Sequence, residues 1–226
     1  MKKLFYLVCL AGLTSCEQPK PVKSGVKRQQ PLNSKYNSLF ELYPNIAIDT
    51  LWVYSPDSAN DVYQGRAIDS VNALFFPQEM AKQHFNEPGF FAIYKFAIDQ
   101  NRLALLTRTP SEYEPSSIKL FIYDRRNDSL GSYIELGEKW GDAGDWMIRN
   151  SWLFRDTSNR LQAFIDVTRG HDNSVDDAND TTTVEKDYFT LLDLSKDKID
   201  TIFADKEELP EKYIHLARLT SKKVKL

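Results

Sequence analysis

Hydrophobic and polar residues alternate in short runs over most of this chain, and clusters of turn-forming residues separate the runs. Alternation with a period of two, in runs rich in β-branched and aromatic residues, is typical of strands. The pattern therefore predicts a mainly β protein of about ten strands. One strand is expected at residues 46–54, and two sets of four follow, at residues 91–98, 102–107, 118–123 and 132–136, and at residues 147–154, 161–167, 188–194 and 199–203.

The two sets of predicted strands share local sequence. Asn101-Arg102-Leu103 and Asn159-Arg160-Leu161 each begin the second strand of a set. We interpret this as an internal repeat of a four-stranded antiparallel meander, with chance similarity between hairpins as the alternative. Two antiparallel meanders with the early strand favour a β-sandwich or barrel, and propeller-like blades are the alternative.

Few other elements are expected. Pro77 is well placed in the first turn of a short helix at residues 77–84, and residues 207–219 predict a closing helix. Residues 62–76 are ambiguous between strand and helix. Residues 17–35 contain three prolines and almost no large apolar side chains, so they predict a flexible tether that buries too little to fold.

The first sixteen residues predict targeting to a membrane. Lys2 and Lys3 precede an apolar run at residues 4–13, which is too short to span a bilayer, and small residues then lead to Cys16. The sequence Leu13-Thr14-Ser15-Cys16 resembles the lipobox of bacterial lipoproteins. This resemblance implies cleavage before Cys16, lipidation of that cysteine and anchoring of the mature chain in the membrane.

The predicted organisation is a signal peptide at residues 1–15, a lipidated Cys16 with a tether to residue 35, and one β-rich domain at residues 36–226. By resemblance to lipoprotein sorting, Glu17 favours the outer membrane. Gln18-Pro19-Lys20 lacks the acidic cluster that surface-exported lipoproteins often carry after the cysteine, which favours a domain facing the periplasm, and surface exposure is the alternative. The net charge of −3 argues against nucleic acid as a partner. Cys9 is lost with the signal peptide, so neither a disulfide nor thiol chemistry is expected.

The first candidate binding stretch is Trp140-Gly141-Asp142-Ala143-Gly144-Asp145-Trp146. Two indoles flank two carboxylates, which suits stacking against a sugar ring or acid–base work on a glycosidic bond. The alternative is a long connection between the two repeats, in which the Trp side chains fill the core and Asp and Gly only make turns.

A second candidate is the acidic stretch at residues 169–187. Asp172, Asp176, Asp177 and Asp180 are hard oxygen ligands of the kind that bind calcium, but their spacing is not that of an EF-hand. A mobile polar hairpin tip is the alternative. No other cofactor is expected.

Two functions follow. The first is a lipid-anchored, non-enzymatic domain of the cell envelope that binds a glycan or an envelope protein, or that acts as a scaffold. The second is an envelope hydrolase of the glycoside type that uses Asp142, Asp145 or Asp166. No compact catalytic motif is present in the sequence, but carboxylate pairs leave no short motif.

Overall fold

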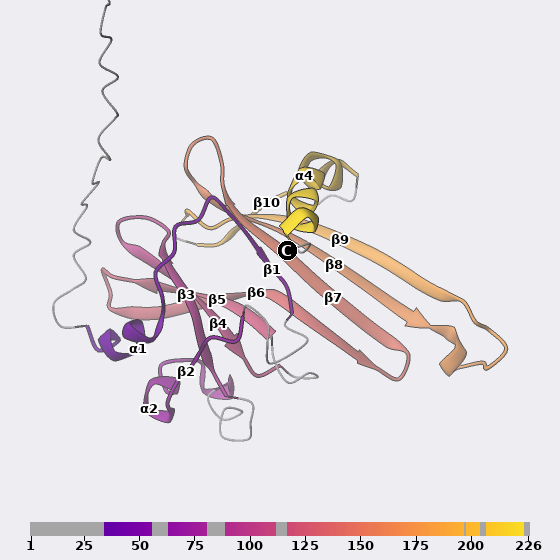
Figure 1. The fold of residues 1–226 in the computed structure, drawn as a ribbon, viewed down its shortest axis with the longest axis horizontal. Coiled ribbons are helices and arrows are strands. Elements are labelled where there is room, and N and C mark those ends of the chain that lie inside the picture. Colours follow the sequence, from indigo (N-terminus) through magenta and orange to yellow (C-terminus); the bar gives the residue numbers. More distant parts are fainter. Residues whose placement is uncertain are drawn as a thin grey trace, which may run out of the picture. The chain divides into compact units, whose positions relative to one another are not determined.

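The strands of this protein pair antiparallel and almost entirely in sequence order (Figure 1). The computed structural model describes residues 34–55, 63–80, 89–111, 117–196, 198–203 and 207–223, which all belong to the unit Pro31–Leu226. Cys16 and the predicted tether lie outside them, except for Ser34 and Lys35. The strands are β1 (Thr50–Val53), β2 (Arg66–Ala67), β3 (Phe91–Ala97), β4 (Arg102–Thr109), β5 (Ser117–Asp124), β6 (Ser129–Asp142), β7 (Asp145–Arg155), β8 (Leu161–Asp172), β9 (Thr183–Asp193) and β10 (Asp200–Phe203).

Strand β6 divides its length between two neighbours. Its residues 129–137 pair with β5, and its residues 138–142 pair with β7. The strands therefore form a first sheet, β2 to β5 with the start of β6, and a second sheet, the end of β6 with β7 to β10. Strand β1 takes the remaining edge of β7, where Thr50–Val53 lies beside Phe154–Ser151. The predicted meanders correspond to β3–β6 and β7–β10.

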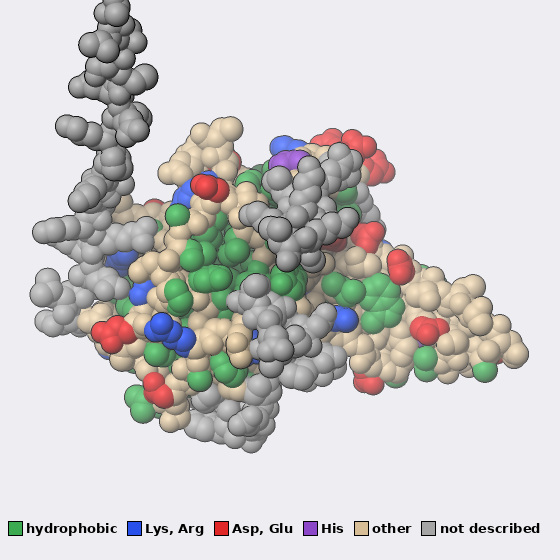
Figure 2. Space-filling view, in the orientation of Figure 1, with side chains coloured by type: hydrophobic (Ala, Val, Ile, Leu, Met, Phe, Trp, Pro, Cys, Tyr) green, Lys and Arg blue, Asp and Glu red, His purple; other side chains and the backbone are tan. Residues whose placement is uncertain are grey.

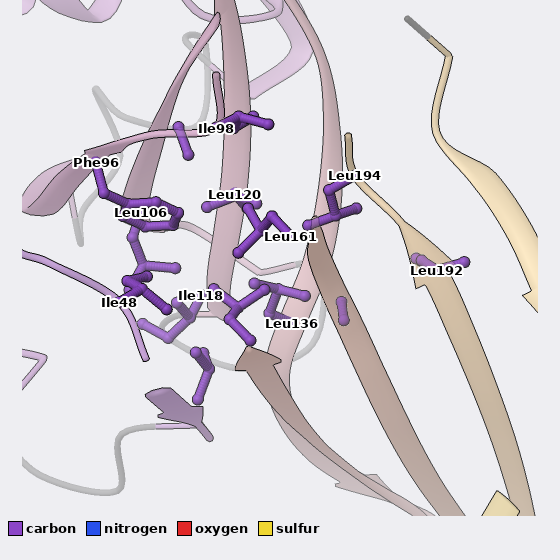
Figure 3. Close-up of a cluster of buried hydrophobic side chains, with 14 of the residues drawn as sticks. Ile48, Phe96, Ile98, Leu106, Ile118, Leu120, Leu136, Leu161, Leu192 and Leu194 are labelled. Atoms are coloured by element: carbon purple, nitrogen blue, oxygen red, sulfur yellow. The ribbon is translucent and has the colours of Figure 1, made fainter. Parts of the chain in front are cut away.

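The largest hydrophobic cluster joins the two sheets (Figure 3). Leu106 and Leu120 enter it from the first sheet, and Leu161 and Leu192 enter it from the second. Burial of apolar side chains between two facing sheets is the stabilising principle of a β-sandwich. Strands β2 and β10 end the order of strands and do not pair with each other among the described residues, so the sheet is not closed. The prediction of a mainly β, sandwich-like fold is confirmed.

Helices cover part of the outer face of each sheet. On the first, Leu103 and Leu105 of β4 pack in a cluster with side chains of α1 (Asn37–Leu42) and α2 (Ser70–Ala73). On the second, Trp152 and Phe164 pack with side chains of α4 (Glu208–Lys223). Burial on both faces explains why β4 is an almost continuous apolar run.

Two arginines tie the sheets together at one end of the sandwich. The Arg102 guanidinium donates to the carbonyls of Ser195 and Lys196, and it pairs with Asp99 at 2.6 Å. Arg155 donates from Nη2 to the carbonyl of Ala97 at 2.7 Å. Each arginine thus binds the backbone of the opposite sheet.

The shorter elements agree partly with the sequence pattern. The predicted strand at residues 46–54 is shorter, and the ambiguous stretch contains both β2 and α2. The predicted closing helix is α4, which runs to Lys223. Residues 78–80 are helical after Pro77, and the rest of that prediction lies outside the described residues. Of the helices in the described ranges, none is long and apolar enough to cross a membrane.

Candidate functional site

Four strands of the second sheet continue beyond the sandwich as an arm. We define the arm as residues 138–142 of β6, 145–150 of β7, 166–172 of β8 and 183–188 of β9, together with the connections at residues 143–144 and 173–182. The strands of the arm run toward the right of Figure 1. Met147 is the only described residue of the arm that is fully buried, and residues 183–188 are all exposed. Figure 2 shows a hydrophobic area on this part of the molecule with acidic side chains beside it. Both candidate stretches lie in the arm.

The first candidate stretch is a tight hairpin. The strands β6 and β7 are joined only by Ala143 and Gly144, and Asp142 pairs directly with Asp145. Both turn residues have positive φ, 48° and 89°, as a type I′ turn requires. The interpretation as a long connection with core-filling tryptophans is wrong, because the strands on each side continue to the turn.

The two tryptophans lie on opposite faces of the arm. Residues directly opposite each other in an antiparallel pair share a face. Trp140 pairs with Met147, and Trp146 pairs with Gly141 and with Gly170 on the other side. We call the face of β7 to β9 that carries Leu153 and Ile165 the core face, and the face that carries Trp152 and Phe164 the helix face.

Trp140 therefore lies on the core face and Trp146 on the helix face. The indole of Trp146 covers Gly170, where an added Cβ would lie 2.3 Å from two ring atoms. The two indoles cannot stack on one ligand from both sides, as a single Trp-flanked platform would require.

His171 joins the two candidate stretches at the tip of the arm. Its Nδ1 lies 2.7 Å from Oδ1 of Asp145, and its Nε2 lies 3.0 Å from Oδ2 of Asp176. A neutral imidazole donates from one nitrogen only, whereas the imidazolium donates from both. The hydrogen bond to Asp145, and after it the one to Asp176, raises the pKa of His171 above its ordinary value.

The other predicted calcium ligands make local turns. Asp172 accepts a hydrogen bond from the backbone N–H of Ser174, Asp177 from that of Asn179, and Asp180 from that of Thr182. Strands β8 and β9 continue into the predicted connection, which leaves residues 173–182 between them. Within the described part of the chain, no three His, Cys, Asp or Glu side chains are arranged to hold a metal ion. Calcium binding stays a prediction.

Asp166 lies on the helix face, away from the other two predicted carboxylates. It pairs with Asn150 and Phe189, whereas Asp142 and Asp145 occupy the core face. Its Oδ1 is buried without a hydrogen-bond partner. Burial, and then the charge of Asp187, raise the pKa of Asp166 to about 6. Asp166 and either of the other two carboxylates cannot act on one glycosidic bond, because the sheet separates them.

A buried charge cluster that the sequence analysis did not identify lies where β6 passes between the sheets. Lys119 pairs with Glu135 at 2.8 Å, and Arg149 lies 3.7 Å from Glu135 and 3.9 Å from Glu138. Burial, followed by the charge of Glu135, raises the pKa of Glu138. Two cations and two carboxylates balance in charge, so the cluster is suited to holding β5, β6 and β7 together. The only sequence signal for it is that Lys119, Glu135 and Arg149 are charged residues inside predicted strands.

Comparison with known proteins adds no assignment. No protein-family description, no curated protein and no solved structure matches this chain. The proposals below therefore rest on the sequence and on the geometry described above.

Proposed function

We propose that this protein is a lipid-anchored lipoprotein of the bacterial cell envelope whose β domain binds a partner through the arm and has no catalytic role. The observation that carries the binding role is the arm itself. It is a four-stranded sheet that extends beyond the sandwich, and its two faces and its tip are largely open to solvent.

Three features of the arm support binding. Val184 and Val175 place two aliphatic side chains, 60% and 56% exposed, near its tip, where an apolar surface of a partner can cover them. Tyr188 and the half-buried Trp140 place aromatic groups on the core face, and such groups are common in binding surfaces. The pairing of β7 with β8 continues without a break from the pair Asp145–His171 to the pair Arg155–Leu161, so the arm is also rigidly built.

The positions of the acidic residues favour a binding role over a hydrolase. Asp166 and the pair Asp142–Asp145 lie on opposite faces of one sheet. Of the three predicted carboxylates, only Asp142 and Asp145 share a face, and Asp145 is bound to His171. We therefore propose an envelope protein as the partner, with the lipid at Cys16 holding the domain at the membrane.

The anchoring half of the proposal is tested by Cys16→Ala in the native host. We expect wild type in the membrane fraction, because several acyl chains on one cysteine attach a protein stably. The variant has no thiol to carry lipid, so we expect it in the soluble fraction. A variant that stays in the membrane fraction would contradict the anchor. Ser15→Ala is the matched control, because alanine keeps a small residue before the cysteine and the thiol is retained.

The binding half is tested by a photo-crosslinking residue at Val175 or Val184, with Ser158 at the other end of the β7–β8 hairpin as the control position. We expect one discrete adduct of defined mass from the arm positions in intact cells and none from Ser158. The absence of an adduct from both arm positions would contradict the binding role.

A further inference from the structure

We infer that the outer edge of β9 is a docking site for an extended segment of a partner protein, which adds as a further strand to the second sheet. This inference rests on the proposed function and names the kind of partner. Strand β9 pairs with β8 over its whole length, from Thr183 to Asp193. On its other edge, β10 pairs only with residues 191–193.

Residues 183–187 therefore have no strand on their outer edge within the described part of the chain. Figure 1 shows β9 along the margin of the arm. An open edge of this kind presents backbone N–H and C=O groups in the register of a strand, and such edges bind extended peptides by β-augmentation. Side chains at alternate positions then select the sequence of the added strand.

The two faces of this edge carry opposite charge. On the helix face, β9 presents Glu185 and Asp187, with Asp166 on the neighbouring strand. On the core face it presents Lys186, which pairs directly with Arg169 of β8. Both cations also lie near the ring of Tyr188, Lys186 at 5.2 Å and Arg169 at 5.9 Å from its centroid.

Charge complementarity defines the partner. Opposite charges across a strand pair stabilise it and like charges destabilise it. The added strand should carry Lys or Arg opposite Glu185 and Asp187 on the helix face, and an acidic residue opposite Lys186 on the core face. Val184 on the core face favours an apolar residue opposite it. The partner is thus a protein segment in which basic residues alternate with apolar and acidic ones.

A second copy of this chain is a poorer fit to the edge. Two β9 strands related by a two-fold axis at Lys186 would place Lys186 opposite itself and Glu185 opposite Asp187 of the other copy. Every charged position would then face a like charge. The charge pattern of β9 disfavours self-pairing and leaves the edge for a complementary segment.

The probe is the capped peptide Thr-Val-Lys-Glu-Lys-Val-Thr, which meets these requirements in either strand direction. Its control, Thr-Lys-Val-Glu-Val-Lys-Thr, has the same composition and net charge but places both lysines on the core face. The protein is the mature chain with Cys16→Ala. We expect the probe to shift the backbone amide signals of residues 183–190 in NMR titrations, and to bind about tenfold more tightly than the control.

Glu185→Lys should remove this preference. Glu79→Lys makes the same charge change at an exposed residue next to Met80, which packs on the first sheet, and should retain the preference. The inference is overturned if neither peptide shifts these amides, if both bind equally, or if the shifted amides lie outside β9. Shifts that depend on protein concentration without peptide would identify a second copy as the occupant and would also overturn it. Crosslinks from Val175 with no response to the probe would reject the edge site and leave the proposed function standing.

Discussion

The indole of Trp146 lies against Gly170, its direct partner on the neighbouring strand, so closely that no Cβ fits at residue 170. The glycine here is needed for space, because an added Cβ would meet Cε2 and Cζ2 of the indole at 2.3 Å. Trp146 is one of the two tryptophans that the sequence marks as candidate ligand-stacking groups. In the structure, part of its surface covers a glycine of its own sheet.

Gly170→Ala should displace the Trp146 indole and destabilise the arm by about 1–3 kcal/mol, the usual cost of overpacking. Hydrogen exchange of the backbone amides of residues 145–150 and 166–172 measures the effect locally. Gly131→Ala is the matched control, since its Cβ would meet only an ordinary contact at 3.5 Å. Equal exchange in wild type and Gly170→Ala would show that the indole moves away without cost.

The bridge from Asp145 through His171 to Asp176 predicts a pH-dependent arm tip. NMR titration of the His171 ring should give a pKa above about 6.5, the ordinary histidine value. Asp145→Asn should lower this pKa most and Asp176→Asn less, because the hydrogen bond to Asp145 raises the pKa of His171 more than the hydrogen bond to Asp176 does. The pKa is raised in the folded protein, so the added stability is complete below about pH 6.5 and is lost as the pH rises through the folded pKa.

The control for the histidine bridge is Asp177→Asn. Asp177 is the aspartate adjacent to Asp176, and it accepts its hydrogen bond from Asn179 instead of from His171. It should leave the titration of His171 nearly unchanged. A wild-type pKa at or below the ordinary value would mean that the imidazolium does not bridge the two carboxylates in solution.

Much of the sandwich could be predicted from the sequence because its strands contain mostly apolar or alternating residues. Residues 102–107 and 161–167, for example, are strands as expected. The faces could not be assigned in β4, because Leu103 and Leu105 pack under helices while Ala104 and Leu106 pack between the sheets. A run that is buried on both faces shows no alternation from which a face can be assigned.

The arm was predicted less well for a physical reason. Both of its faces are largely open to water, so residues such as Gly141, Asp142 and Asp145 carry no hydrophobic period although they lie in strands. The contact of Asp145 with His171 spans 26 positions and depends on the register of β7 with β8. Sequence analysis identified Asp145, Asp166 and Asp176, but only the register assigns Asp166 to the other face.

Asp166→Asn should stabilise the protein at neutral pH. The pKa of Asp166 is raised to about 6 in the folded protein, so ionising the buried carboxylate above that pH costs stability. The free energy of unfolding of the variant should exceed that of wild type by about 1–3 kcal/mol at pH 7.5. The difference should disappear as the pH falls well below about 3.9, the ordinary pKa of an aspartate, because Asp166 is then protonated in both the folded and the unfolded states.

Urea unfolding at a series of pH values measures this difference. Asp142→Asn is the control, because Asp142 is an exposed aspartate on the opposite face of the arm and its replacement should change stability little. A variant less stable than wild type at pH 7.5 would show that Asp166 is ionised and well solvated there, or hydrogen-bonded through a rearranged side chain.

The charge cluster at β6 provides the last prediction. Lys119 is nearly buried, with 6% of its side chain exposed, and its partner Glu135 is 22% exposed. Lys119→Met removes one of two cations and leaves Glu135 and Glu138 competing for Arg149, so we expect a loss of about 3 kcal/mol in the free energy of unfolding.

The double variant Lys119→Met with Glu135→Met removes a complete ion pair and keeps Arg149 beside Glu138. It should recover most of that loss, because replacing a buried pair with apolar side chains is often neutral. Lys198→Met, at an exposed lysine, is the control for charge alone. Urea unfolding of wild type, Lys119→Met, Glu135→Met and the double variant gives the coupling energy between Lys119 and Glu135. A double variant no more stable than Lys119→Met would mean that Glu135 is stabilised by Arg149 without help from Lys119.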